Sequence, residues 1–514
     1  MLFNRRMLLQ SMAAAGVALP LGAGMARANG TVLNIGLSDF PHTFLPASRS
    51  VGYATNFAWS LVHARLLRYG VDGRLEGELV ESWDVDGDGV WRLSLKEARF
   101  ADGDPITAET VKWNIERMGS EALGFVNREA YASITTIETP DERSLILHTA
   151  QPNATIPHIF ADPSFFILKP DVTDDPATIV GAGPYVMTAH ENGVSMSFAP
   201  NPNYFKPVLP RFERVNVTVY SDENLRIAAL MAGDVDLADY VPWALMDSVE
   251  GTPGLKLAYE AEGAFMAMTY VARGENSPMA DARIRKAIAF GIRRDEIVQA
   301  VFYGRGAPMN GPPRPANGGF AHEDTNNYWR YDPDLARQLL QEAGAADGFE
   351  CTMLSSSQYG MHRDTAVLVQ NHLQELGIKV NLNMPDWATR TQLAAQGDAD
   401  LIIQGMGGTS LDPSVLSSQM LNPNLPLSST RSHGFTVDGL DDLAQRGMEE
   451  FDLERRREIY HEFDRLVVEN TTFTGLAYRA TGFGHTDRLE GFRMLPSLIS
   501  PFSYMMNDEW SLTG

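Results

Sequence analysis

ELVESW at residues 78–83 and FADGDPITAETV at residues 100–111 are the two most informative runs of the chain. In the second run, Thr107 can cap a helix over 105–118, and Gly119 can end that helix. Three apolar residues at helical spacing would share its buried face. The runs thus predict a strand region followed by an amphipathic helix in a mixed α/β protein.

The composition of the whole chain fits a soluble globular protein. The 514 residues include 44% hydrophobic and 21% charged residues, with a formal net charge of −23. This length corresponds to about three domain-sized units. The acidic balance and the lack of a basic stripe make nucleic acid an unfavourable partner. The single cysteine, Cys351, excludes an internal disulfide and a cysteine-based metal site, and we expect it to be buried.

The N-terminal residues 1–28 predict an export signal. Arg5 and Arg6 precede an apolar stretch, and residues 26–28 fit the small-x-small cleavage rule. The arginine pair resembles a twin-arginine signal, and the general secretion route is the alternative. A transmembrane anchor is disfavoured because the apolar run is short and contains Pro20. We therefore expect a periplasmic protein.

Two helix–glycine–strand units lie far apart in the chain. A helix over 224–232 leads into a strand at 235–238, and a helix over 391–396 leads into a strand at 400–404. This spacing predicts two α/β lobes. Ligands of open α/β sheets bind beyond the carboxyl ends of strands, so the loops after these two strands are predicted to line one cleft.

Further elements follow from the same patterns. We expect a strand at 32–37, a strand around 215–219, and a helix at 364–376 followed by a strand at 378–384. Asp332 and Pro333 can begin a helix that ends near Gly344, and a long charged helix is expected within 449–469. The Pro/Gly-rich stretch 306–319 is predicted to be a surface loop.

Signatures of catalysis and of metal binding are missing from the sequence. No nucleophile elbow, zinc-protease motif, phosphate loop or dinucleotide loop is found. Asp84, Asp86, Asp88 and Gly89 imitate the start of a calcium loop, but Leu95 stands where a glutamate is needed. Since the flanks alternate like strands, we predict a β-hairpin with its turn there, no metal and no cofactor.

Aromatic residues near the predicted cleft loops are the candidate binding residues. Tyr240 and Trp243 follow the first short strand, Trp387 follows Met384, and Met406 and Thr409 follow the strand ending at Gln404 in a glycine-rich run. Glycine lets a backbone approach a ligand closely, and aromatic walls with a few polar groups are typical of a small-molecule pocket. For each residue the alternative is ordinary core packing.

The motifs taken together resemble family 5 of the solute-binding proteins of ABC importers, the peptide/dipeptide/nickel-binding type. The similarity covers nearly all of the chain after residue 28. The matching runs are ELVESW (78–83), FADGDPITAETV (100–111), GAGPY (181–185), NPNY (201–204), RIRKAI (283–288) with Arg293-Arg294, 331–344 and 373–378.

The resemblance implies an α/β two-lobe periplasmic binding protein of the type II flytrap kind, with an extra subdomain in the first lobe. It implies a first lobe at 29–262, a second lobe at 263–482 and a return to the first lobe at 483–514. A monomer would bind a small organic solute between the lobes and deliver it to the transmembrane permease subunits and their ATPase, without being an enzyme. The alternatives are a secreted hydrolase with a carboxylate pair, or a sensing or chaperone receptor. The predicted ligand-binding residues are Ser38, Phe40, Tyr53, Tyr240, Trp243, Trp387, Met406, Thr409 and Asp412.

One departure from the family bears on the ligand. In peptide-binding members, an aspartate in the loop after the second-lobe strand pairs with the peptide ammonium group. Thr409 stands at that position here, and Met406 stands at the position of the preceding tryptophan. A threonine cannot neutralise a buried cation. We therefore predict a solute that is neutral at this point, such as a sugar, a blocked peptide or an opine-like compound, unless Asp412 or Asp239 takes over the role.

Overall fold

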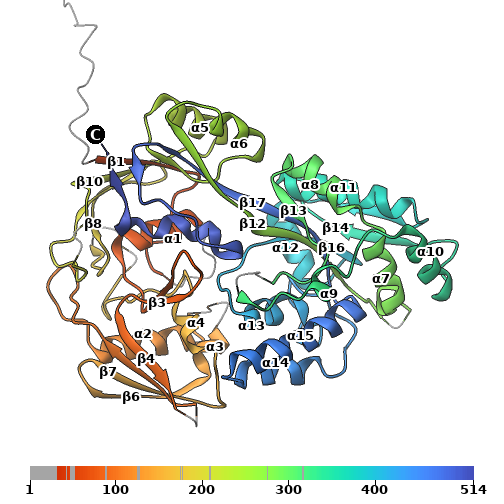
Figure 1. Cartoon of the computed structure of the whole chain (residues 1–514), viewed down its shortest axis with the longest axis horizontal. Coiled ribbons are helices and arrows are strands. Elements are labelled where there is room, and N and C mark those ends of the chain that lie inside the picture. Colours follow the sequence, from red (N-terminus) through yellow and green to blue (C-terminus); the bar gives the residue numbers. More distant parts are fainter. Residues whose placement is uncertain are drawn as a thin grey trace, which may run out of the picture.

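The computed structural model describes residues 32–513 except 42, 47–52, 87–88, 124, 126–127, 174, 176–177, 208–209, 275 and 315–317. The predicted export signal and Asp88 lie outside the described residues. Figure 1 shows two α/β lobes side by side, joined by two long strands that run through the middle of the molecule.

These two strands, β12 (Leu255–Tyr270) and β17 (Thr474–Thr486), form the connection between the lobes. They pair antiparallel along their length, and the register is irregular between Glu260 and Ala264. Through them one mixed sheet extends across the molecule, in the order β15-β14-β16-β12-β17-β11-β1-β10-β9-β8, with β13 also paired to β17.

The first lobe is built on the parallel pair β1 (Val32–Leu37) and β10 (Arg214–Val219), both of which the alternating pattern predicts. Leu33, Ile35 and Leu37 point into its core. Its other elements are α1 (Tyr53–Val62), β2 (Leu67–Tyr69), β3 (Leu75–Gly77), β8 (Tyr185–Glu191), β9 (Ser195–Pro200), α5 (Glu223–Ala232), β11 (Leu237–Ala238) and α6 (Trp243–Glu250).

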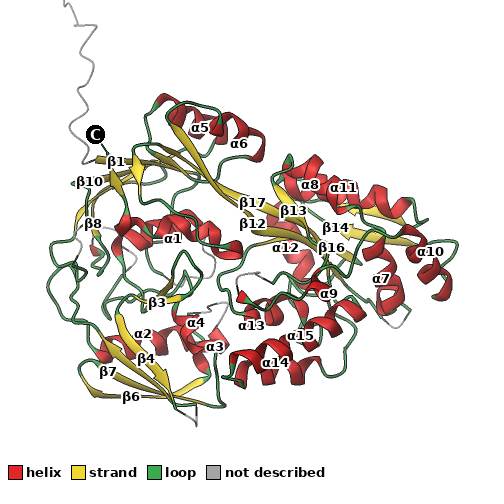
Figure 2. Cartoon of the chain, viewed as in Figure 1, coloured by secondary structure: helices red, strands yellow, loops and turns green. Residues whose placement is uncertain are grey.

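An added subdomain carries the first informative runs of the sequence. Its antiparallel sheet has the order β4-β5-β7-β6, and α2, α3 and α4 lie beside it (Figure 2). The predicted hairpin is confirmed, because Val85 of β4 pairs with Trp91 of β5. Thr107 caps α2 through a reciprocal bond pair with Thr110, as predicted. The bounds are β4 (Val80–Val85), β5 (Trp91–Leu95), α2 (Ala108–Gly119), α3 (Arg128–Ala132), β6 (Ile134–Asp141), β7 (Ser144–Thr149) and α4 (Ile156–Phe160).

The second lobe repeats the helix–glycine–strand unit of the first. Helix α5 ends at Gly233 and α12 ends at Gly397, both with left-handed backbones that favour glycine. The second-lobe elements are α7 (Ala282–Phe290), α8 (Arg294–Phe302), β13 (Gly306–Pro308), α9 (Glu323–Asn326), α10 (Pro333–Glu342), β14 (Glu350–Leu354), α11 (Gly360–Gln374), β15 (Lys379–Asn383), α12 (Trp387–Gln396), β16 (Leu401–Met406), α13 (Pro413–Leu416), α14 (Leu440–Glu449) and α15 (Leu453–Asn470), with short turns η2 (Pro278–Ala280) and η4 (Ser417–Leu421).

The described residues 306–314 do not form the surface loop that the Pro/Gly content of 306–319 predicts. Their first three residues form β13, which pairs with β17. Met309 and Arg314 are buried, and the Arg314 guanidinium binds the carboxylate of Asp464 in α15 at 2.8 Å. The prediction is wrong because turn-forming residues indicate local conformation and say nothing about a partner 150 residues away.

After β17 the chain returns to the first lobe. It forms β18 (Leu489–Glu490), η5 (Ser497–Met505), η6 (Asn507–Glu509) and β19 (Ser511–Leu512). Trp510 is buried in the first-lobe core, and Asn507 donates to the Ser60 hydroxyl of α1 at 2.9 Å. No helix in the described part of the chain is long and apolar enough to cross a membrane.

Candidate ligand site between the lobes

The loop after β11 is held by a buried arginine from α5. The Arg226 guanidinium donates to the carbonyl oxygens of Tyr220, Asp239 and Tyr240 at 2.8–3.1 Å. Tyr240 has a φ of 48°, a conformation that a non-glycine residue adopts only when its surroundings fix it. Arg226 therefore fixes the direction in which the Tyr240 phenol points.

That phenol meets Arg479, which projects from the connecting strand β17. Arg479 Nη1 donates to the Tyr240 hydroxyl at 2.9 Å, and the guanidinium carbon lies 5.9 Å from the Trp243 ring centre. Trp243 donates its indole N–H to the carbonyl of Ala480 and packs edge-on against Phe302 of the second lobe. The two predicted first-lobe aromatics thus lie at the junction of the lobes.

On the second-lobe side, Trp387 packs against His362, with ring centres 5.1 Å apart, and under the guanidinium of Arg390. Burial, with the nearby charges of Arg390 and Arg479, lowers the pKa of His362 to about 3. His362 is therefore neutral at physiological pH, and the local charge is positive.

The glycine-rich run at the end of β16 brings the second lobe close to the first. A Cβ at Gly407 would lie 3.0 Å from the Tyr53 hydroxyl, and one at Gly405 would lie 2.8 Å from His362 Nε2. Side chains at these positions would displace both neighbours. We call Tyr53, Tyr240, Trp243, His362, Trp387 and Arg479 the interlobe cluster. Four of its members are predicted binding residues.

The remaining predicted residues lie outside this cluster. The Ser38 hydroxyl donates to Asp239 at 2.7 Å, and Phe40 is buried against Phe44 in the first-lobe core. Met406 packs with the core around Phe265 on the other face of the sheet. Thr409 is half-buried, and its hydroxyl has no hydrogen-bond partner among the described residues.

Asp412 is committed to an ion pair inside the protein. Its carboxylate accepts from Arg456 at 2.6 and 2.9 Å and caps α13 through the Ser414 N–H. Burial alone would raise the pKa of Asp412, but Arg456 and His158 outweigh it and hold the pKa well below its usual range. This position has the contacts of a structural residue.

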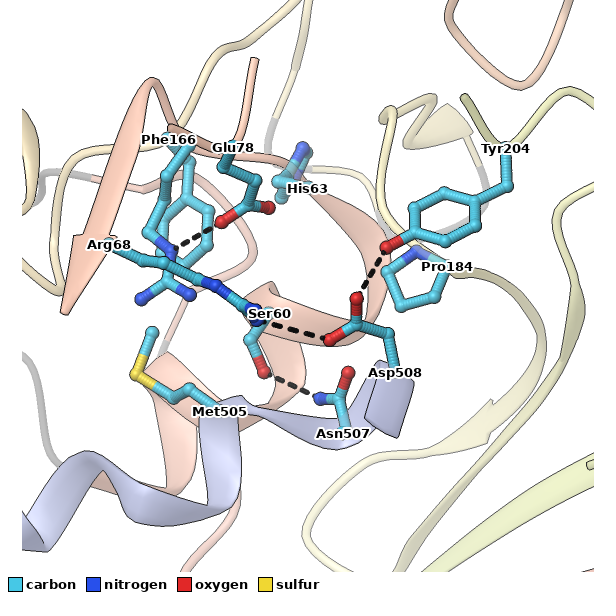
Figure 3. A pocket seen from close by; sticks show the side chains of 11 residues that line it. Ser60, His63, Arg68, Glu78, Phe166, Pro184, Tyr204, Met505, Asn507 and Asp508 are labelled. Atoms are coloured by element: carbon cyan, nitrogen blue, oxygen red, sulfur yellow. Dashed lines mark hydrogen bonds and ion pairs between the residues drawn. The ribbon is translucent and has the colours of Figure 1, made fainter. Parts of the chain in front are cut away.

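A separate cavity lies inside the first lobe, away from the interlobe cluster (Figure 3). Arg68 and Asp508 form an ion pair at its wall, and Tyr204 donates to the same carboxylate at 3.0 Å. Its volume of about 10 Å³ is close to the minimum for one water molecule. The cavity ties the C-terminal segment to the first lobe and is too small for an organic solute.

Sequence reasoning missed Arg226, His362 and Arg479. Arg479 had a usable signal, because it is the only residue of the apolar strand β17 that carries a permanent charge. Arg226 and His362 lie on ordinary amphipathic helices, where the sequence does not distinguish them. Across the described residues, no group of three or more His, Cys, Asp or Glu side chains is arranged to hold a metal ion.

Comparison with known proteins agrees with this geometry. The profile described as "Bacterial extracellular solute-binding proteins, family 5 Middle" matches residues 74–424. The chain belongs to this family. The predicted two-lobe periplasmic binding protein fold is confirmed, and the chain is a solute-binding component of an ABC importer, the function that the motifs imply.

Family 5 relatives extend over nearly the whole chain. The "Probable D,D-dipeptide-binding periplasmic protein DdpA" of Escherichia coli K12 is 26% identical, covering 92% of this chain and 93% of the relative. The E. coli K12 "Glutathione-binding protein GsiB" is 24% identical, covering 82% and 84%.

Solved structures show the same architecture. The binding protein AgaA from A. tumefaciens R10, in complex with agropinic acid, is 29% identical, with a TM-score of 0.82 over 94% of this chain and 99% of that chain. DppA from Helicobacter pylori with the peptide STSA is 18% identical, with a TM-score of 0.77 over 94% and 98%, a likeness of fold alone.

Proposed function

We propose that this family 5 protein captures a small organic solute that carries no obligatory free ammonium group, such as an opine-like compound, a sugar or a blocked peptide. The observation that supports this most is that the carboxylates near the predicted ammonium position already have partners within the protein. Thr409 has no charge, and Asp412 is fully engaged by Arg456 and Ser414.

Asp239, the other candidate for that role, is partly engaged, because its Oδ1 has an arginine nearby but no hydrogen bond among the described residues. One carboxylate oxygen accepts from Ser38, and the other lies 3.2 Å from Arg226. Moving Asp412 to a ligand would leave Arg456 buried without its charge partner, at a cost of about 3–5 kcal/mol. Moving Asp239 would remove the ion pair of Arg226, which would keep its three backbone acceptors. An opine-like solute also agrees with the likeness to AgaA, whose structure contains agropinic acid.

A second candidate ligand is an ordinary peptide. The dipeptide and glutathione names of the curated relatives favour it, at 24–26% identity. The two candidates differ in whether binding requires a free α-amino group, and so can be separated directly.

The proposal also includes the boundary between the lobes, the partners of the protein and its location in the cell. The boundary between 262 and 263 is supported by the register irregularity of β12 between Glu260 and Ala264, where two stretches of pairing with β17 meet. The protein acts as a periplasmic monomer, binds at the interlobe cluster without chemical change to the solute, and docks on permease subunits whose ATPase drives uptake. Family members are periplasmic solute-binding proteins.

The test is a thermal-shift and calorimetry panel of agropinic acid, sugars, di- and tripeptides, and the same peptides acetylated at the amino end. We expect binding of one of the first classes or of acetylated peptides, with the solute recovered unchanged by mass spectrometry. Sub-micromolar binding of free peptides that acetylation abolishes would contradict the proposed ligand class.

Export through the twin-arginine route is tested in cells. Replacement of Arg5 and Arg6 by lysine should leave the precursor in the cytoplasm, while a Lys286→Arg control should be exported. Unchanged periplasmic levels of the lysine variant would assign export to the general secretion route.

A further inference from the structure

Arg479 has an unusual position for a charged residue. It lies in the continuously buried strand β17, where it pairs with Ala264 of β12 at the end of the register irregularity and with Gly306 of β13. Its exposed fraction is 6%. A guanidinium is therefore held at the junction of the two lobes with little access to solvent.

The hydrogen bonds of Arg479 are incomplete. Its one hydrogen bond to a described residue goes to the neutral hydroxyl of Tyr240, its Nε has no partner among them, and no described carboxylate forms an ion pair with it. Glu260 and Glu262, the nearest acidic residues along β12, are not paired to it.

The other buried arginines behave differently, and they serve as an internal comparison. Each binds a carboxylate or at least two acceptor groups, although Arg294 Nη2 and Arg390 Nε also have no partner among the described residues. These pairs are Arg65 with Glu78, Arg226 with Asp239, Arg314 with Asp464, Arg456 with Asp412, and Arg285, Arg294 and Arg390 with two or more acceptor oxygens each. Among the buried arginines of the described residues, Arg479 alone has neither a carboxylate nor a second acceptor, so it is the one that an external group can complete.

The surroundings of Arg479 fit an anionic partner. Arg390 adds a second positive charge, and the buried His362 is neutral. The hydroxyls of Thr481, Ser500 and Tyr504 are buried and have no hydrogen-bond partner among the described residues. A Cβ at Gly263 would lie 2.5 Å from the Thr481 hydroxyl, so the glycine lets the Thr481 and Ser500 hydroxyls pack closely against β12. These donors can serve the remaining oxygens of an acidic group.

We propose that Arg479 is the counterion of an anionic group of the solute, such as a carboxylate, and that it makes lobe closure depend on that group. The inference rests on the proposed function, because it assigns one chemical feature to the solute captured between the lobes. It excludes solutes that are neutral throughout and leaves open what the rest of the solute is.

Closure depends on the anion for an electrostatic reason. When the lobes meet, as they do here through Trp243 and Phe302, the guanidinium is taken out of water. An unpaired buried charge is costly, so the ligand-free protein favours an open arrangement. A bound anion removes that cost only in the closed arrangement, and this differential affinity shifts the population.

The test compares Arg479→Met, which keeps the length and apolar stem, with the control Arg283→Met. Arg283 is a half-exposed second-lobe arginine paired with Asp281, away from the cluster. Calorimetry with agropinic acid and with its neutral amide should show that the wild type and the control prefer the acid. Arg479→Met should lose at least about 100-fold in affinity for the acid and lose the preference. Acid affinity within threefold of wild type, or a retained preference, would overturn the inference.

A ligand-free measurement decides the inference if the wild type binds neither compound. Small-angle scattering should give a smaller radius of gyration for Arg479→Met than for the wild type, since closure no longer buries an unpaired charge. Identical ligand-free profiles would overturn the coupling to closure. Failure of the proposed function is distinguishable, because then no solute of the panel raises the melting temperature of the wild type.

Discussion

The phenol oxygen of Tyr69 in the first lobe lies 2.7 Å from the hydroxyl oxygen of Ser410 in the second lobe. The same oxygen accepts from the N–H of Leu411 at 3.2 Å and lies 2.8 Å from Nδ1 of His158. All of these groups except His158 are buried. The hydroxyl of one first-lobe tyrosine thus joins that lobe to the loop that follows β16.

Tyr69→Phe should therefore weaken the contact between the lobes without disturbing the interlobe cluster. Loss of a hydrogen bond contributes about 1 kcal/mol, so bound solute should leave about fivefold faster. Stopped-flow release of bound solute measures this rate, with the exposed Tyr303→Phe as the matched control. Equal release rates for Tyr69→Phe and wild type would show that this contact does not stabilise the closed arrangement.

Asp412→Asn should destabilise the protein rather than impair recognition. The substitution leaves Arg456 buried without its charge partner, which costs about 3–5 kcal/mol. Chemical denaturation should show this loss, and the double variant Asp412→Leu/Arg456→Met should recover most of it. If stability is unchanged and solute affinity falls, then Asp412 is a binding residue, as the sequence predicted.

Stability should fall in acid because of buried histidines. Burial, with a smaller contribution from Arg117, lowers the pKa of His63 to about 3 from its ordinary 6.5. Between these two values the unfolded chain holds one more proton than the folded protein. The contribution of His63 is therefore complete above pH 6.5 and is lost by about 1.4 kcal/mol for each pH unit below it, down to about pH 3. His63→Gln should have a flatter unfolding profile between pH 6.5 and 4, and the exposed His190→Gln should not.

The two tryptophans of the interlobe cluster should report binding. Trp243 and Trp387 come from different lobes, so a solute between them should change the tryptophan fluorescence. Trp387→Ala should weaken binding about fivefold, since a stacked aromatic contributes about 1 kcal/mol beyond its area. Trp83→Phe, in the subdomain hairpin, is the control. If neither Trp243→Ala nor Trp387→Ala changes the dissociation constant, these side chains are core residues.

Much of the fold follows from local sequence signals. The cap at Thr107, the alternation in β1 and β10, and the glycines that end α5 and α12 act within a few residues, so the sequence contains them. The pairing of β13 with β17 and of Arg314 with Asp464 depends on neighbours far along the chain, and local composition misled the prediction there.

The residues of the candidate site also divide into those that local sequence predicts and those that depend on distant neighbours. Tyr240, Trp243 and Trp387 could be predicted because each follows a strand or begins a helix at the expected edge. Asp412 looked equally suitable, but its partner Arg456 lies 44 residues further on, and only the fold shows that the carboxylate is occupied. That Arg479 lacks a charge partner could not be predicted from the sequence. It depends on all the groups that surround the guanidinium in the folded protein, and these come from distant parts of the chain.

The central claim is that an external anion between the lobes completes the charge of Arg479. A crystal structure of the protein with agropinic acid bound tests it most directly. The solute should lie within the interlobe cluster, with a carboxylate oxygen within hydrogen-bond distance of Arg479 Nε. A solute bound with its carboxylate turned to solvent, or to another residue while Arg479 stays unpaired, would contradict it.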